Sequence, residues 1–180
     1  MKHNFRKIEG KWQQKWEEAG IFHAVDGSDK PKFYGLVEFP YPSGAGMHVG
    51  HIKAYSSLEV ISRKRRMEGY NVLFPIGFDA FGLPTENYAI KTGTHPRKIT
   101  DNNIAKFTEQ LKKVGFSFDW TRVVDTTDED YYKWTQWAFL QMFASWYDNA
   151  QQKARPISEL EEIFAKEGNT KVDAACGEVE

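Results

Sequence analysis

The spacing of apolar residues along the first half of the chain predicts helices that alternate with short strands. Helical spacing over residues 4–19 predicts an amphipathic helix that ends at Gly20, with an apolar face of Phe5, Ile8, Trp12 and Trp16. The aromatic and β-branched stretch Lys32–Phe39 lies between two prolines and predicts a buried strand. A second helical pattern runs from His48 to Met67, with Ile52, Tyr55, Leu58 and Ile61 on one face. The stretch Asn71–Ile76 then predicts a second strand.

This order of strand, glycine-rich segment, helix and strand predicts a βαβ unit. Such a unit has parallel strands joined by a right-handed crossover, and ligands of such sheets bind at the carboxyl ends of the strands. Here these ends are the segments "FPYPSG" and "IGFDAFGLP". The predicted fold class is therefore α/β, a parallel sheet with flanking helices.

The second half of the chain predicts further helices. Thr100 is the expected N-cap of a helix that ends at Gly115, with Ile104, Phe107, Leu111 and Val114 on one face. Another helix is expected to begin at a capping box of Thr126 and Glu129 and to continue through Trp146. Because apolar residues lie nearly all round it, we expect burial on more than one side.

Residues 147–156 form a polar break, and a short helix follows it. Ser158 and Glu161 have the spacing of a capping box, the expected inward residues are Leu160, Ile163 and Phe164, and Gly168 is the expected end. We divide the chain into an N-terminal helical extension (1–31), an α/β domain (32–146) and a helical tail (147–180).

Composition limits the classes of protein to consider. The 180 residues are 41% hydrophobic and 27% charged, and no apolar run reaches the roughly 20 residues of a membrane span. The polar start of the chain predicts no signal peptide, so we expect a cytoplasmic protein without a membrane partner. A single cysteine, Cys176, excludes an intrachain disulfide within this sequence. The net charge of −1 argues against a uniformly basic nucleic-acid binder, and the strip Arg63–Arg66 is either a solvated helix end or a tRNA contact.

The glycine-rich segment suits a phosphate ligand. Pro40 and Pro42 fix two φ angles, whereas Gly44, Gly46 and Gly50 let a ligand approach the backbone without meeting a Cβ. The helix that begins beside this segment presents free N–H groups and the positive end of its dipole.

Two histidines at the start of this helix are the candidate catalytic residues. His48 and His51 are three apart, so both imidazoles can face the same space and donate to phosphoryl oxygens as charge builds in a transition state. A metal site is an alternative, but no acidic or cysteine cluster completes it, and we expect none. Two surface histidines beside a turn are the simpler alternative.

The sequence around these histidines resembles a known family. "HVGH", after a strand and at the start of a helix, resembles the HIGH signature of class I aminoacyl-tRNA synthetases, which have a Rossmann-like nucleotide-binding fold. The segments "FPYPSG", "GFDAFGLPTEN", "FDWTR" and "YYKWTQW" resemble leucyl-tRNA synthetases in particular. The resemblance spans roughly residues 5 to 146. It implies that residues 32–146 are the first half of a Rossmann-like catalytic domain and that residues 147–180 are a helical tail or the start of an insertion or linker, to which we assign no site.

The resemblance implies roles for individual residues. ATP-binding roles fall on His48, Gly50 and His51 and on the preceding Pro42, Ser43 and Gly44. Amino-acid-binding roles fall on Phe39 and Tyr41, which would flank the leucine side chain, and on Asp79, which would receive the α-ammonium group. Asp79 as a simple loop cap is the alternative.

The resemblance also implies a reaction. A leucine carboxylate attacks the α-phosphate of ATP, with Mg²⁺ expected beside the ATP, and leucine then passes from leucyl-adenylate to tRNA(Leu). The second family signature, KMSKS, is absent from these residues. We therefore expect an N-terminal part of a leucyl-tRNA synthetase, weak or inactive by itself, and we expect its uncovered sheet edge to cause self-association.

The sequence allows alternative functions and alternative roles for several residues. A smaller H-x-G-H nucleotidyltransferase and a non-catalytic tRNA- or protein-binding paralogue are the alternatives to a tRNA ligase. Trp134 and Trp137 lie at helical spacing, which favours a core position over base stacking. Phe78, Thr85 and Glu38 depart from the residues usual in the family, and Glu38 either assists the ammonium group or faces solvent.

Overall fold

The structure is a computed structural model that describes residues 3–42 and 46–169. The chain forms two compact units, Met1–Thr127 and Asp128–Glu180, and each is described by itself. No helix in the described ranges combines the length and the apolar character that a bilayer crossing demands.

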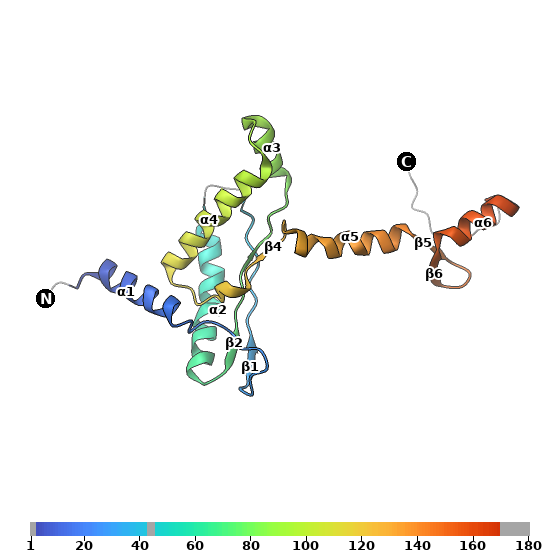
Figure 1. Ribbon diagram of the computed structural model, residues 1–180. Helices are drawn as coiled ribbons and strands as arrows, with labels where there is room; N and C mark the ends of the chain where they lie inside the picture. The colour runs from blue at the N-terminus through green and yellow to red at the C-terminus, as the bar shows by residue number, and fades with distance from the viewer. Residues whose placement is uncertain (1–2, 43–45, 170–180) are drawn as a thin grey trace. The chain divides into compact units, whose positions relative to one another are not determined.

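The first unit alternates helices with short strands (Figure 1). Its elements are α1 (Phe5–Glu18), β1 (Lys32–Tyr34), α2 (Val49–Met67), β2 (Asn71–Leu73), β3 (Gly77–Phe78), α3 (Leu83–Thr92), α4 (Pro96–Val114), a 3₁₀ turn (Trp120–Arg122) and β4 (Val124–Asp125).

The predicted βαβ unit is present. β1 pairs with β2 in parallel, with Phe33 opposite Val72, and α2 connects them. Both strands are shorter than predicted because only three residues of each form the ladder. Beyond Leu73 the chain stays hydrogen-bonded to later segments instead: the carbonyl of Phe74 accepts from Asp119 N at 2.8 Å, and that of Ile76 accepts from Val124 N at 3.1 Å.

A single apolar cluster joins the strands to α2 and α4. Its buried members are Val37, Tyr55, Val72, Phe74, Ile76, Leu111, Phe116 and Phe118. Phe78, Ala80 and Phe107 form a second, smaller cluster near the end of β3. The predicted apolar face of α2 is correct at Tyr55 but wrong at Ile61, which is 45% exposed, while Ser62 beside it is fully buried.

The start of α4 differs from the prediction, and one helix was missed. α4 begins at Pro96, and His95 rather than Thr100 is its N-cap, because a proline at the first helical position already has the helical φ. Thr100 is buried inside the helix instead. The predicted end at Gly115 is confirmed, with a left-handed φ of 83°. α3 was not predicted; it also carries a proline in its first turn.

The second unit contains α5 (Glu129–Phe143), β5 (Ser145–Asp148), β6 (Lys153–Pro156) and α6 (Ile157–Glu167). The prediction of a helix through Trp146 is wrong, because Trp146 pairs with Arg155 in an antiparallel hairpin. The polar residues 147–156, predicted as a break, form most of this hairpin. Neither predicted capping box forms, since Asp128 and Pro156 occupy the two N-cap positions and neither side chain makes a capping hydrogen bond.

The predicted burial of α5 is wrong. No residue of this helix is buried, and Trp134 and Trp137 are 64% and 57% exposed. In α6 the prediction holds in part, because Leu160 is buried whereas Phe164 is 41% exposed. The hairpin is closed by Asp148, whose carboxylate accepts from Gln151 N at 3.0 Å and pairs with Arg155 at 2.9 Å.

Candidate nucleotide and amino-acid site

The chain leaves β1 through a segment whose backbone is fixed by neighbouring elements. Tyr55 Oη donates to the carbonyl of Glu38 at 2.9 Å, and Asp79 N donates to the carbonyl of Pro40 at 3.1 Å. Burial, together with the charge of Glu38, raises the pKa of Tyr55 to about 12, so this phenol remains a donor at neutral pH. Tyr55 therefore links α2 to the chain after β1, and Asp79 links the chain after β3 to it.

The two histidines cap α2 and stack on each other. His48 is the N-cap residue, and its Nδ1 accepts from Gly50 N at 3.1 Å. His51 Nδ1 in turn accepts from His48 N at 3.3 Å, and the two ring centroids are 3.9 Å apart. Because an accepting ring nitrogen carries no proton, each neutral ring carries its proton on Nε2. The cap does not use either Nε2–H, and no hydrogen bond to another described residue involves them, so both can donate to a ligand.

Gly50 makes this arrangement possible. A Cβ at this position would lie 2.8 Å from His48 Cε1 and 2.9 Å from His48 Nδ1. The glycine of the H-x-G-H segment therefore has a role that the sequence did not indicate, because it leaves space for the capping ring.

The surroundings of His51 favour its neutral form. Burial and the neighbouring His48 lower the pKa of His51, and the charge of Glu38 opposes them. Its ring also contacts Tyr55 and meets the edge of Phe107, with centroids 5.9 Å and 6.2 Å away. Glu38 is exposed, so it acts on this ring through its charge.

Tyr41 and Asp79 lie together on a separate pocket. A cavity of about 290 Å³ is lined by Tyr41, Pro42, Asp79, Phe81, Gly82, Pro84 and Thr85. Its walls are mainly apolar, and Asp79 is its only acidic side chain. This chemistry suits a small ligand that carries one cation and an apolar side chain.

Phe39 does not line that pocket. Its ring packs on Gly77, where a Cβ would lie 2.6 Å from Phe39 Cε2 and 2.7 Å from the carbonyl oxygen of Val124. The structure thus brings Tyr41, Pro42 and Asp79 together and places Phe39 against the first residue of β3. Ser43 and Gly44, also predicted to bind ATP, lie outside the described residues.

Sequence reasoning missed two amides of α4 that bind the backbone of Pro42 and of Met47. Asn103 Nδ2 donates to the carbonyl of Pro42 at 2.7 Å, and Gln110 Oε1 accepts from Met47 N at 2.9 Å. Their spacing of two helical turns, along the edge of the predicted apolar face, is the sequence feature that could have indicated them. Thr126, predicted as a helix cap, instead accepts from Ala80 N at 2.9 Å and so fixes the residue after Asp79.

Two arginines of the basic strip at the end of α2 bind the chain that follows α4. Arg66 donates to both Oγ and the carbonyl of Ser117, and Arg63 donates to the carbonyl of Gly115 and pairs with Glu59. The prediction of a solvated helix end is therefore wrong for Arg63 and Arg66, which hold the chain after α4 against α2. Lys64 alone is largely exposed in this strip.

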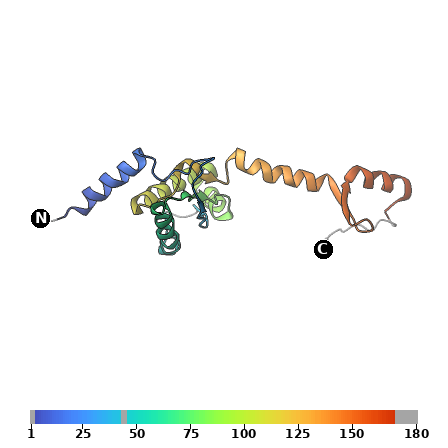
Figure 2. The same ribbon diagram turned by 90° about the horizontal axis from the view of Figure 1, so that it is seen from below.

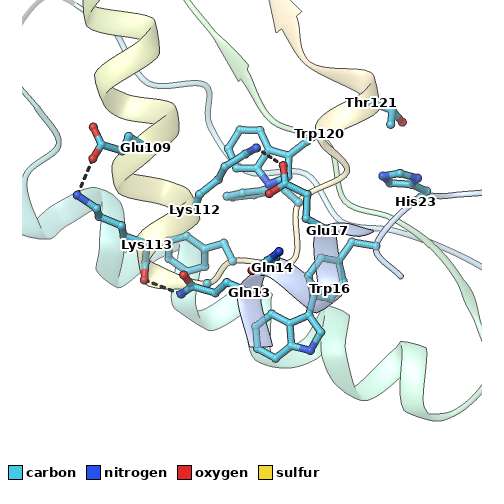
Figure 3. Close-up of a pocket in the computed structure, with 14 residues that line it drawn as sticks. Gln13, Gln14, Trp16, Glu17, His23, Glu109, Lys112, Lys113, Trp120 and Thr121 are labelled. Atoms are coloured by element: carbon cyan, nitrogen blue, oxygen red, sulfur yellow. Dashed lines mark hydrogen bonds and ion pairs between the residues drawn. The ribbon is translucent and has the colours of Figure 1, made fainter. Parts of the chain in front are cut away.

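Another cavity of the first unit, of about 610 Å³, lies between α1 and α4 (Figure 3). Its charged rim residues are already paired: Lys112 with Glu17 at 2.5 Å and Lys113 with Glu109 at 2.6 Å. Gln13 donates to the carbonyl of Lys113 at 3.0 Å. These contacts attach α1, which lies at the edge of the unit in Figure 2, and they leave no unpaired charge on this rim for a ligand.

Among the described residues, no group of three or more His, Cys, Asp and Glu side chains is arranged to hold a metal ion.

Comparison with known proteins shows the family of this chain. The family model described as tRNA synthetases class I (M) matches residues 36–179, and the chain belongs to this family. Among individual relatives, the leucine–tRNA ligases of Christiangramia forsetii and Phocaeicola vulgatus are each 56% identical, over 97% and 99% of this chain and 18% and 19% of their own lengths. That of Alkaliphilus oremlandii is 62% identical over 78% of the chain and 18% of its own length.

Solved structures agree with this assignment. The LeuRS–tRNA–LeuAMS ternary complex of Agrobacterium radiobacter superposes with a TM-score of 0.73 at 35% identity, over 85% of this chain and 21% of that one. Methionyl-tRNA synthetase of Mycobacterium tuberculosis in complex with methionyl-adenylate superposes with a TM-score of 0.55 at 27% sequence identity. The match covers 72% of this chain and 27% of that one. The predicted Rossmann-like α/β class and the resemblance to leucyl-tRNA synthetases are confirmed.

The chain spans about a fifth of the length of the curated relatives that it matches. The alignments also cover nearly the whole chain, so the resemblance extends past residue 146, where the motifs quoted from the sequence ended.

Proposed function

We propose that this chain forms the part of a leucine–tRNA ligase that binds ATP and leucine. The reaction is the ATP-dependent formation of leucyl-adenylate, followed by transfer of leucine to tRNA(Leu). The observation that carries the proposal is that both histidines at the start of α2 use Nδ1 in the cap, which leaves Nε2–H to donate, while Asp79 lines an apolar pocket together with Tyr41 and Pro42.

Each group has a task in this proposal. His48 and His51 donate from Nε2 to phosphate oxygens of ATP, beside the positive end of the α2 dipole. Asp79 receives the α-ammonium group, and Tyr41 flanks the leucine side chain. Mg²⁺ enters with the ATP phosphates, because Mg²⁺ is commonly held by substrate phosphates and few protein carboxylates.

Leucine-dependent exchange of labelled pyrophosphate into ATP tests the proposal. We expect exchange in the complete gene product that contains this chain, and weak or no exchange in the chain alone. Exchange that depends on a different amino acid would remove the leucine assignment. A smaller nucleotidyltransferase would instead be active within this chain without leucine.

We also propose that the isolated chain self-associates with a second copy. In the described residues each sheet has only two strands, and α5 exposes a set of large apolar side chains: Trp134, Trp137, Phe139, Leu140, Met142 and Phe143. Light scattering over a series of concentrations should show a mass that rises with concentration. A constant monomer mass at high concentration contradicts the proposal.

A further inference from the structure

The segment between β1 and α2 is held from α4 at two points. Asn103 Nδ2 binds the carbonyl of Pro42 at 2.7 Å, and Gln110 Oε1 binds the N–H of Met47 at 2.9 Å. Both bonds are partly buried, and the two amides lie two turns apart on one face of α4. The helix therefore contacts this segment at Pro42 and again at Met47, just before the N-cap of α2.

Each contact lies next to a different part of the site. Pro42 lines the cavity that contains Tyr41 and Asp79, whereas Met47 directly precedes the N-cap His48. We propose that Asn103 and Gln110 are positioning residues of the ligase site: Asn103 sets the amino-acid pocket, and Gln110 sets the phosphate-binding histidines. The kinetic consequences of this assignment rest on the proposed function, whereas the two contacts do not.

The fit between Gln110 and Gly46 supports a specific role. A Cβ on Gly46 would lie 2.6 Å from Gln110 Nε2 and 3.0 Å from Oε1, so the amide occupies the space that the missing side chain leaves. A larger residue at position 46 would displace the amide from Met47.

α4 itself is firmly placed, which lets its amides define positions. Phe107 and Leu111 are buried in the two apolar clusters, and Phe107 also meets the ring of His51. Side chains fixed by a packed helix locate their partners more precisely than side chains on loops do.

The first experiment needs no nucleotide. Hydrogen exchange of the Met47 amide is measured in the chain and in its Gln110→Met and Gln110→Glu variants. We expect about fivefold faster exchange in Gln110→Met, the factor that corresponds to a neutral hydrogen bond of about 1 kcal/mol. Gln110→Glu keeps an acceptor oxygen and should retain protection. Unchanged protection in Gln110→Met overturns the assignment.

The second experiment separates positioning from general stability. Pyrophosphate exchange is measured in the complete gene product with Asn103→Ala, Gln110→Met and, as a matched control, Asn102→Ala, which alters an exposed residue of the same helix. We expect Asn103→Ala to raise KM for leucine about fivefold and Gln110→Met to raise KM for ATP by a similar factor, each with the other KM nearly unchanged.

The two experiments fail in different ways. If both variants raise both KM values equally, or neither value changes, the positioning roles are wrong although the ligase function stands. If the unaltered protein shows no leucine-dependent exchange, the proposed function is wrong, and amide exchange at Met47 decides the role of Gln110 by itself.

Discussion

At the scale of single residues, His48 uses its two ring nitrogens for different tasks. Nδ1 caps α2 through Gly50 N, and Nε2 is left to donate to a ligand. Asparagine and glutamine can each replace one of these nitrogens. The asparagine amide lies about as far from the backbone as Nδ1 does, and the glutamine amide about as far as Nε2 does. The two functions of this residue can therefore be tested separately.

We expect His48→Asn to keep the stability of the fold and to lose ATP-dependent activity, since asparagine is among the best N-cap residues but provides no group at Nε2. His48→Gln should cost about 1 kcal/mol of unfolding free energy and retain more activity. Urea unfolding of the chain and pyrophosphate exchange of the complete gene product measure the two effects. The reverse order of activities would show that the cap, not the Nε2 donor, matters for the reaction.

Gly50→Ala tests the space for the capping ring. A Cβ 2.8 Å from His48 Cε1 forces the ring to move, which removes a cap worth about 1 kcal/mol. Alanine returns a similar amount, about 0.5–1 kcal/mol, through its better helix propensity. We therefore expect a nearly unchanged urea midpoint and a clear loss of ATP affinity in titration calorimetry. Unchanged affinity would mean that the ring position is not important for binding.

At the scale of elements, a buried carboxylate joins α2 to the chain after α4. Glu59 is 8% exposed, and its Oε2 accepts from both N and Oγ of Ser117 at 2.8 Å, while Oε1 pairs with Arg63. Arg66 donates to the same serine, and both arginines stack near Phe22, with Arg63 and Arg66 5.3 Å and 5.0 Å from its ring centroid. The network therefore also holds the segment that follows α1.

Removing this carboxylate should destabilise the first unit. We expect Glu59→Ala to lower the unfolding free energy by about 1–3 kcal/mol, because it leaves buried donors of Ser117 without an acceptor. Glu68→Ala on the same helix is the control: its pair with Arg65 is solvent-accessible, so its loss should cost less than about 1 kcal/mol. Equal urea midpoints for the two variants would contradict the importance of the network.

The elements also show what could be predicted from sequence. The spacing of apolar residues and the positions of the glycines predicted the βαβ order and α2 correctly. Gly115 likewise predicted the end of α4. The start of α4 and the hairpin after α5 were not predicted. A helix start at His95–Pro96 and a polar turn give a weaker sequence signal than a regularly spaced apolar face. The paired histidines were found, whereas Asn103 and Gln110 were not, since their partners are backbone atoms of a distant segment.

At the scale of the whole molecule, stability should depend on pH in two steps. Burial and His48 lower the pKa of His51 below its ordinary value of 6.5. For Asp119, burial acts to raise the pKa, but hydrogen bonds from Thr121 and Ala24 outweigh it and lower the pKa below 3.8. In both cases the unfolded chain binds a proton at a higher pH than the folded chain does.

Acidification should therefore destabilise the fold first below about pH 6.5, through His51, and again below about pH 4, through Asp119. Asp119→Asn should remove the second step, and His51→Asn should remove the first. Urea unfolding at a series of pH values measures both. A first step that persists in His51→Asn would assign it to another group.

The central claim is that His48 and His51 donate from Nε2 to the phosphates of ATP. The most direct measurement is ¹⁵N NMR of the imidazoles in the histidine-labelled chain during titration with ATP. We predict that the Nε2 signals of His48 and His51 shift while both Nδ1 signals keep the values of hydrogen-bonded acceptors, and that His3, His23 and His95 do not respond. Signals of His48 and His51 that stay unchanged at every ATP concentration, or that show Nδ1 protonated in the free chain, would contradict the account.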